Sequence, residues 1–101
     1  MMTRKDYMAG RCSHLEYYSQ FVTPSIKTAV ARKFDLEKLT LAYIEDENLN
    51  NIPLKEWDSL PILTRQVNEA YKQAGDFPTI AGLCCIAKTA AVMLIFNIPC
   101  S

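Results

Sequence analysis

Residues 80–96 have the sequence I-A-G-L-C-C-I-A-K-T-A-A-V-M-L-I-F, which is apolar on nearly every side of a helix. A helix of this kind is normally buried. Thr79 follows Pro78 and can cap the start of the helix, which we expect to run from Ile80 to about Asn97. What covers this helix therefore decides the fold.

Three arrangements would cover it. It could be the central helix of the domain, it could lie between its own subunit and a second copy, or it could be a weak membrane tail. Lys88 near its centre argues against the membrane, because a lysine there costs about 2.5–3.5 kcal/mol on insertion scales. Its length is also at the lower limit for a membrane span, about 17 residues. In the other two arrangements, small side chains would allow close helix approach: Ala81, Gly82, Cys85 and Ala90.

The rest of the chain carries helix signals and no strand pattern. Helix starts are indicated by Thr3-x-x-Asp6, by the capping box Ser13-x-x-Glu16, by Thr23-Pro24, by Asp35 and by Ser59 with Pro61. Gly10 and Gly75 stand where helices would stop. Residues 45–52 predict a loop, and Pro53 could open a short helical turn that contains Trp57.

Apolar spacing predicts which helix faces point inward. One stripe runs through Ile26, Val30 and Phe34, and the next through Leu36, Leu39, Ala42, Tyr43 and Ile44. Two helices with a break at Phe34–Asp35, or one bent helix, both fit. We predict an all-α, small single domain over residues 1–101, a bundle of about five helices with a largely apolar C-terminal helix.

Charge limits the partners. The formal net charge is zero, so steering of the whole molecule to nucleic acid is not expected. Residues 1–44 carry seven basic and four acidic side chains, whereas residues 45–101 carry four basic and seven acidic ones. An anionic ligand would therefore favour the N-terminal part, unless this imbalance is ordinary variation.

The cysteines and the N-terminus indicate a compartment. Cys12, Cys84, Cys85 and Cys100 form no C-x-x-C pattern, and adjacent Cys84 and Cys85 are poorly placed for a structural disulfide. The first residues, M-M-T-R-K-D, lack the apolar run of a secretory signal. We expect a protein of the cytoplasm, and, with the resemblance below, of the cytoplasm of a bacterial host.

A candidate ligand-binding face lies between Ser13 and Lys27. On a helix, His14, Tyr17, Tyr18 and Phe21 share one side. Such rings could stack on a base and bond its edge, Gln20 could add an amide, and Arg11 and Lys27 could hold phosphates. The competing interpretation is an aromatic helix packed into the core. The pattern is suited to a nucleotide-type ligand, and duplex DNA binding is not expected, because it requires clustered Lys and Arg.

Catalytic and metal chemistry have little support. His14 is the single histidine, and no G-x-S-x-G, H-E-x-x-H or phosphate-binding glycine motif is present. Cys12 and His14 lack partners at zinc spacing. We expect no enzyme activity, no metal and no cofactor. An alternative partner surface would use Glu45 and Glu47 in the acidic loop with Trp57, although Trp57 could equally be a core residue under that loop.

One stretch runs from Tyr7 through H-L-E-Y-Y-S-Q-F-V-T to E-N-L-N-N-I-P-L-K-E-W-D, ending at Asp58, and another is C-I-A-K-T-A-A at Cys85–Ala91. Together they resemble a family of small uncharacterised proteins encoded by bacteriophages and prophages. Where similar proteins continue after the second stretch with a charged helical tail, this chain has V-M-L-I-F-N-I-P-C-S.

The resemblance implies a counter-defence role. Our leading hypothesis is a phage protein that binds and sequesters a nucleotide-type immune signal, as a homo-oligomer joined partly through the last helix. The alternative is a protein–protein inhibitor of a host defence complex, such as a CRISPR nuclease. A small DNA-binding regulator is a third hypothesis, which the neutral net charge disfavours.

Overall fold

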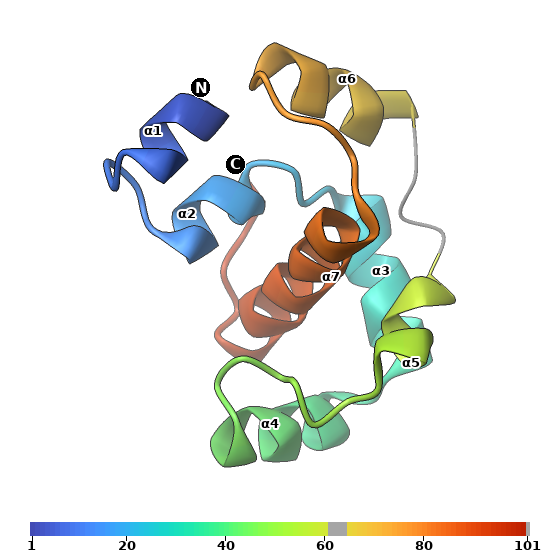
Figure 1. Cartoon of the computed structure of the whole chain (residues 1–101). Coiled ribbons are helices and arrows are strands. Elements are labelled where there is room, and N and C mark those ends of the chain that lie inside the picture. Colours follow the sequence, from blue (N-terminus) through green and yellow to red (C-terminus); the bar gives the residue numbers. More distant parts are fainter. Residues whose placement is uncertain (61–64, 101) are drawn as a thin grey trace.

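A side chain caps the start of most helices in this fold. A computed structural model describes residues 1–60 and 65–100 of the chain. Within those residues the chain is all-helical (Figure 1). The helices are α1 (Arg4–Met8), α2 (His14–Ser19), α3 (Pro24–Lys33), α4 (Leu36–Glu45), α5 (Leu54–Asp58), α6 (Arg65–Gln73) and α7 (Ile80–Ile95).

The capping box predicted at Ser13 is present, and the helix start predicted at Thr3 also has one. The hydroxyls of Thr3 and Ser13 accept hydrogen bonds from the backbone N–H three residues on, and the carboxylates of Asp6 and Glu16 accept from the backbone N–H of the cap. These bonds satisfy amides that a helix start leaves without an intrahelical partner. Single side-chain caps begin three further helices, as expected: Thr23, Asp35 and Thr79.

The two predicted glycine stops are also confirmed. Gly10 follows α1 with φ +74° and Gly75 follows α6 with φ +75°. This left-handed conformation is strained for most side chains and open to glycine. The chain therefore reverses after each helix at a position that the sequence marks.

The helix count differs from the expected number. The described residues hold seven helices rather than about five, and the excess comes from α1 and α5, which have five residues each. Phe34 is extended, with φ −122° and ψ 139°, so α3 and α4 are separate helices rather than one bent helix. Helix α7 ends at Ile95, before the expected Asn97.

Ser59, which we predicted to cap the start of a helix, lies at the end of one instead. Ser59 lies at the C-terminal end of α5, where its hydroxyl donates to the Glu56 carbonyl oxygen. Pro61 lies outside the described residues. Helix α6 is described from Arg65.

The inward stripe of α4 is narrower than predicted. Leu39 and Ala42 are buried and Tyr43 is half-buried, but Leu36 and Ile44 are exposed. Ile44 lies about 140° around the helix from Leu39, because each residue turns the helix by about 100°. Two of the residues that we predicted to face inward therefore lie on the solvent side of α4, beside exposed Leu41.

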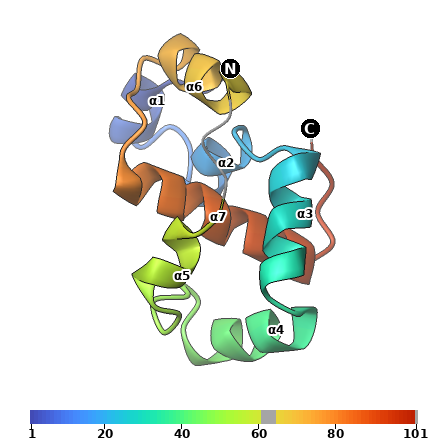
Figure 2. The same ribbon diagram turned by 90° about the vertical axis from the view of Figure 1, so that its right-hand side faces the viewer.

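Helix α7 is the centre of the fold. It packs against α2, α3, α4 and α5, which surround it in two perpendicular views (Figures 1 and 2). Ala87, Ala90 and Ala91 on this helix are completely buried, and Gly82 is buried near its start. The central-helix arrangement therefore accounts for its apolar character within one subunit. Among the described residues, no helix combines the length and apolar character needed to cross a membrane.

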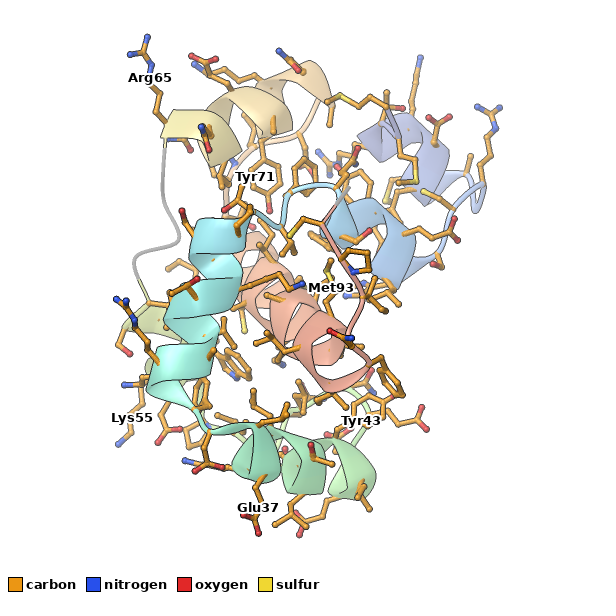
Figure 3. The ribbon with its side chains drawn as sticks, turned by 180° about the vertical axis from the view of Figure 1, so that it is seen from behind. Glu37, Tyr43, Lys55, Arg65, Tyr71 and Met93 are labelled. Carbon is orange, nitrogen blue, oxygen red and sulfur yellow. The ribbon has the colours of Figure 1, made fainter. Side chains whose placement is uncertain are left out.

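An aromatic cluster joins α2 to α1 and α6. The rings of Tyr7 and Tyr17 stack with centroids 4.7 Å apart, and those of Phe21 and Tyr71 stack at 4.6 Å. Figure 3 shows Tyr71 below α6, on its side toward the body of the molecule. The Tyr71 hydroxyl is buried and has no hydrogen-bond partner among the described residues. It lies 2.8 Å from the position that a Cβ atom on Gly82 would occupy.

Replacing Gly82 with alanine tests this contact. We expect a net loss of about 1 kcal/mol in the free energy of unfolding, since overpacking costs about 1–3 kcal/mol and the helix gains about 1 kcal/mol from alanine. In a Tyr71→Phe background the same substitution should cost less, because the hydroxyl is gone and Thr79 Oγ1, at 3.2 Å, becomes the nearest atom to the added Cβ. Urea unfolding of the four proteins measures both effects. An equal loss in both backgrounds would show that the hydroxyl is not the obstacle.

Candidate ligand-binding site

His14 is the first residue of α2, next to the capping serine, and the residue as a whole is exposed, although its ring is partly covered. Its Nδ1 atom lies 2.9 Å from the hydroxyl of Tyr7, and its ring centroid lies 4.7 Å from that of Tyr18. Partial burial lowers the pKa of His14, and the nearby charge of Lys88 lowers it further. The imidazole is therefore mainly neutral at pH 7.

Lys88 is the charged residue within the apolar helix α7. It is half-buried, and its Nζ atom donates to Oδ1 of Asn50 over 2.8 Å. A lysine in the middle of a buried helix needs a route to polar partners, because an isolated buried charge is very costly. Here the loop between α4 and α5 provides the partner.

That loop is held by its own polar groups. The carboxylate of Asp46 accepts from the backbone N–H groups of Asn48 and Asn50, at 2.9 and 3.1 Å. Leu49 adopts φ 56° and is completely buried, so its side chain fixes the turn in the core. The side chains on either side of Leu49 are consequently exposed beside α7.

These segments enclose a groove of about 440 Å³ that we call the His14–Lys88 groove. Its lining comes from α2, α4, the α4–α5 loop and α7, and consists of His14, Leu15, Tyr43, Glu47, Asn48, Leu49, Asn50, Cys85, Lys88, Thr89 and Val92. Small-molecule sites typically have about 300–1,000 Å³ and combine apolar walls with a few polar groups. The groove has both properties.

Tyr43 supplies an aromatic wall. Its ring is half-buried and meets Phe96 edge-on, with centroids 5.4 Å apart and planes at 82°. In Figure 3 Tyr43 lies at the end of α4, beside the C-terminal end of α7. Leu15, Leu49 and Val92 add aliphatic surface. A flat ring could therefore pack against this wall while amide and amine groups meet its edge.

The aromatic residues predicted as base-stacking groups divide into two kinds. Tyr17 and Phe21 are 0% and 2% exposed, so neither ring offers a surface to a ligand in this structure. The Tyr17 hydroxyl donates to Asp76 over 2.7 Å. Tyr18 is half-buried, and burial raises its pKa to about 12. The sequence placed these rings on one side correctly, but that side faces the core more deeply than the binding hypothesis requires.

The polar residues of the predicted site are engaged elsewhere. Gln20 donates to the Met2 carbonyl oxygen at 2.8 Å, and Lys27 donates to that of Ile98 at 2.7 Å. Arg11 pairs with Asp6 over 3.1 Å. Of the seven predicted ligand-binding residues, His14 lines the groove, and Tyr18 contacts the His14 ring. Six of the seven, Tyr18 included, lie outside its lining.

The three residues of the alternative partner surface, Glu45, Glu47 and Trp57, differ in their exposure to solvent. Glu45 and Glu47 are exposed, as that hypothesis requires. Trp57 is 2% exposed and packs on Phe34, with ring centroids 4.8 Å apart. It is therefore the core residue that the competing interpretation described and offers no anchor to a partner.

The thiol in the lining of the groove is that of Cys85. Burial raises the pKa of the Cys85 thiol, so little thiolate is present at neutral pH to act as a nucleophile. All four cysteines are free thiols. In the part of the chain that the structure describes, no three histidine, cysteine or carboxylate side chains gather as a metal site.

Sequence reasoning missed the main cation of the groove. Lys88 entered that reasoning only as an argument against a membrane span, although a single charge in an otherwise apolar helix is itself a signal of a polar contact. No binding motif marked Tyr43, Asn48 or Asn50; the sequence predicted Tyr43 only as an inward-facing residue of its helix. Comparison with protein-family models, curated protein sequences and solved structures finds no match to this chain.

Because His14 is the single histidine, its titration is directly measurable by proton NMR. We expect a pKa below 6.5 in the folded protein, rising in Lys88→Met but staying below 6.5, because the effect of burial remains. Lys72→Met, on α6, is the matched control and should leave it unchanged. A folded pKa at or above 6.5 would contradict the described environment.

The lowered pKa of His14 also determines how the free energy of unfolding changes with pH. A folded-state pKa below the unfolded value means that the native state favours neutral His14. Its contribution is fully present above about pH 6.5 and is lost as the pH falls through that value toward the folded pKa. Comparison of wild type with His14→Gln by urea unfolding at pH 7.5 and below 6 isolates this effect.

Proposed function

We propose that the His14–Lys88 groove binds a small nucleotide-type ligand. The observation that carries the proposal is the convergence of Lys88, His14 and Asn50 beside the ring of Tyr43, from segments far apart in the sequence. The base would pack against Tyr43 and the aliphatic wall. The amides of Asn48 and Asn50 would bond its polar edge, and Lys88 would meet a phosphate oxygen.

The charges of the groove select among nucleotides. Lys88 and Glu47 are the permanently charged side chains in its lining, and His14 is mainly neutral at pH 7. A ligand with many phosphates would bring further negative charge close to Glu47, which is unfavourable. A cyclic mononucleotide or a cyclic dinucleotide, with one or two charges, suits this balance better than a nucleoside triphosphate.

The proposed biological role is sequestration of a nucleotide immune signal by a phage counter-defence protein in the cytoplasm of a bacterial host. It is supported by three features: the resemblance to phage-encoded proteins, a groove of ligand size, and the raised pKa of the half-buried Cys85 thiol, which leaves little thiolate for covalent chemistry. A second copy could cover the exposed rim of the groove at Leu15 and Phe96. The homo-oligomer remains part of this proposal.

A nucleotide panel read by native mass spectrometry tests the groove. We expect a cyclic nucleotide to bind in fixed ratio, and Lys88→Met to weaken it about tenfold or more, since a hydrogen bond to a charged group is worth about 1.5–3 kcal/mol. Lys27→Met is the matched control, because Lys27 bonds the Ile98 carbonyl outside the groove. Loss of binding in Lys27→Met but not in Lys88→Met would instead support the site expected from the Ser13–Lys27 segment.

The pH dependence of binding provides a second test. Protonated His14 attracts an anion, so an anionic ligand should bind more tightly as the pH falls through the pKa of His14, which lies below 6.5. His14→Gln should remove this dependence while keeping the ring position polar. Titration calorimetry at several pH values measures it, and an unchanged pH profile in His14→Gln would exclude His14 from the site.

The second candidate function is a protein–protein inhibitor of a host defence complex. Exposed Glu45 and Glu47 favour it, but they do not serve equally well as tests. Glu47 lines the His14–Lys88 groove, whereas Glu45 does not. A charge change at Glu45 therefore separates the two functions, and one at Glu47 does not.

A further inference from the structure

The solvent face of α4 exposes more apolar surface than a helix of this length needs. Leu41 and Ile44 are 57% and 72% exposed, and Leu36 at the start of the helix is 56% exposed. Single exposed apolar residues are ordinary, but several on one short helix suggest an interaction surface. The opposite side of α4, with Leu39 and Ala42, is already packed in the core.

A shallow groove of about 420 Å³ lies beside this face. Buried Ala42 and Ile52 form its apolar floor, and exposed Leu41 lies beside them. The exposed carboxylates in its lining form an acidic rim: Asp35, Glu37 and Glu45. Figure 3 shows Glu37 on the outer side of α4, pointing away from the body of the molecule. This surface shares no lining residue with the His14–Lys88 groove.

The acidic rim has little internal compensation. Lys38 is the cation in the described lining, and it is drawn toward Glu56, whose Oε2 atom lies 3.8 Å from Nζ. Lys38 also lies over the Phe34 ring, 5.6 Å from its centroid. Glu45 accepts one hydrogen bond, from the Asn51 amide, at 3.2 Å. The carboxylates of Glu37 and Glu45 therefore keep a negative field over an apolar floor.

We propose that this surface, which we call the α4 surface, binds a cationic amphipathic helix of a partner protein. Apolar residues of the partner would cover Leu41 and Ile44, and its Lys or Arg side chains would meet Glu37 and Glu45. A second copy that presented its own α4 is a poorer occupant, because it would set acidic rims against each other. This surface is separate from the His14–Lys88 groove. For the second candidate function, the protein–protein inhibitor, it names the binding surface and the chemistry of the partner.

The probe is a labelled synthetic peptide, an amphipathic helix with leucine on one face and lysine on the other. Its control is the same peptide with glutamate replacing every lysine. Fluorescence anisotropy at physiological salt measures binding to the full chain. We expect the cationic peptide alone to bind. Equal binding of both peptides, or of neither, would overturn the proposal.

Two double variants dissect the surface. Glu37→Gln with Glu45→Gln removes charge, and Leu41→Ser with Ile44→Ser removes apolar contact, and each should weaken the peptide about tenfold or more. Glu69→Gln on α6 is the charge control, because Glu69 is exposed and far in sequence from α4. If the serine variant bound the peptide as tightly as wild type, the peptide would be held by non-specific charge attraction alone, which would contradict the proposal.

Further measurements distinguish loss of the peptide site from unfolding and from self-association. Circular dichroism of each variant establishes that the fold persists, and Lys88→Met should bind the peptide like wild type even where it loses nucleotide. Sedimentation identifies self-association. If wild type forms a dimer that Ile44→Ser dissociates, a second copy occupies the α4 surface, and the proposed partner helix is wrong.

Discussion

Close packing around the alanine-rich centre of α7 is the constraint on which the rest of the structure depends. Ala87, Ala90 and Ala91 have no exposed surface, and such small side chains allow the neighbouring helices to approach the α7 backbone closely. Four helices rest on this one element. The same packing decides where Lys88 can go: its side chain leaves the core where α2 and the α4–α5 loop leave a groove.

The α4–α5 loop connects this core to both candidate surfaces. Leu49 is buried with a left-handed backbone, a conformation that costs about 1–3 kcal/mol at a non-glycine residue and persists only when the surroundings hold it. Its neighbours Asn48 and Asn50 line the His14–Lys88 groove, while Asn51 and Ile52 line the groove of the α4 surface. One anchored turn thus positions polar groups on two faces. Both functional proposals depend on the same local geometry.

The candidate site shows what helical periodicity can predict about side chains and what it cannot. Spacing alone put His14, Tyr17, Tyr18 and Phe21 on one side, and their rings do contact one another. Periodicity gives a direction around a helix axis but not the depth at which that side is covered. Tyr17 and Phe21 turned out to be core, because α1 and α6 supply the rings that cover them, Tyr7 and Tyr71. His14, at the start of α2, remains exposed as a residue.

The sequence by itself determined the all-helical class, most helix starts and two helix ends. Caps such as Ser13 with Glu16, and the left-handed glycines, act over three or four residues, so the local sequence contains them completely. Only the tertiary structure decided which side chains meet in a groove. Asn50 and Lys88 are 38 residues apart in the chain, and their contact arises because packing on α7 brings the loop to that helix. No local pattern encodes such a distance, which is why the sequence predicted the helices and missed the groove.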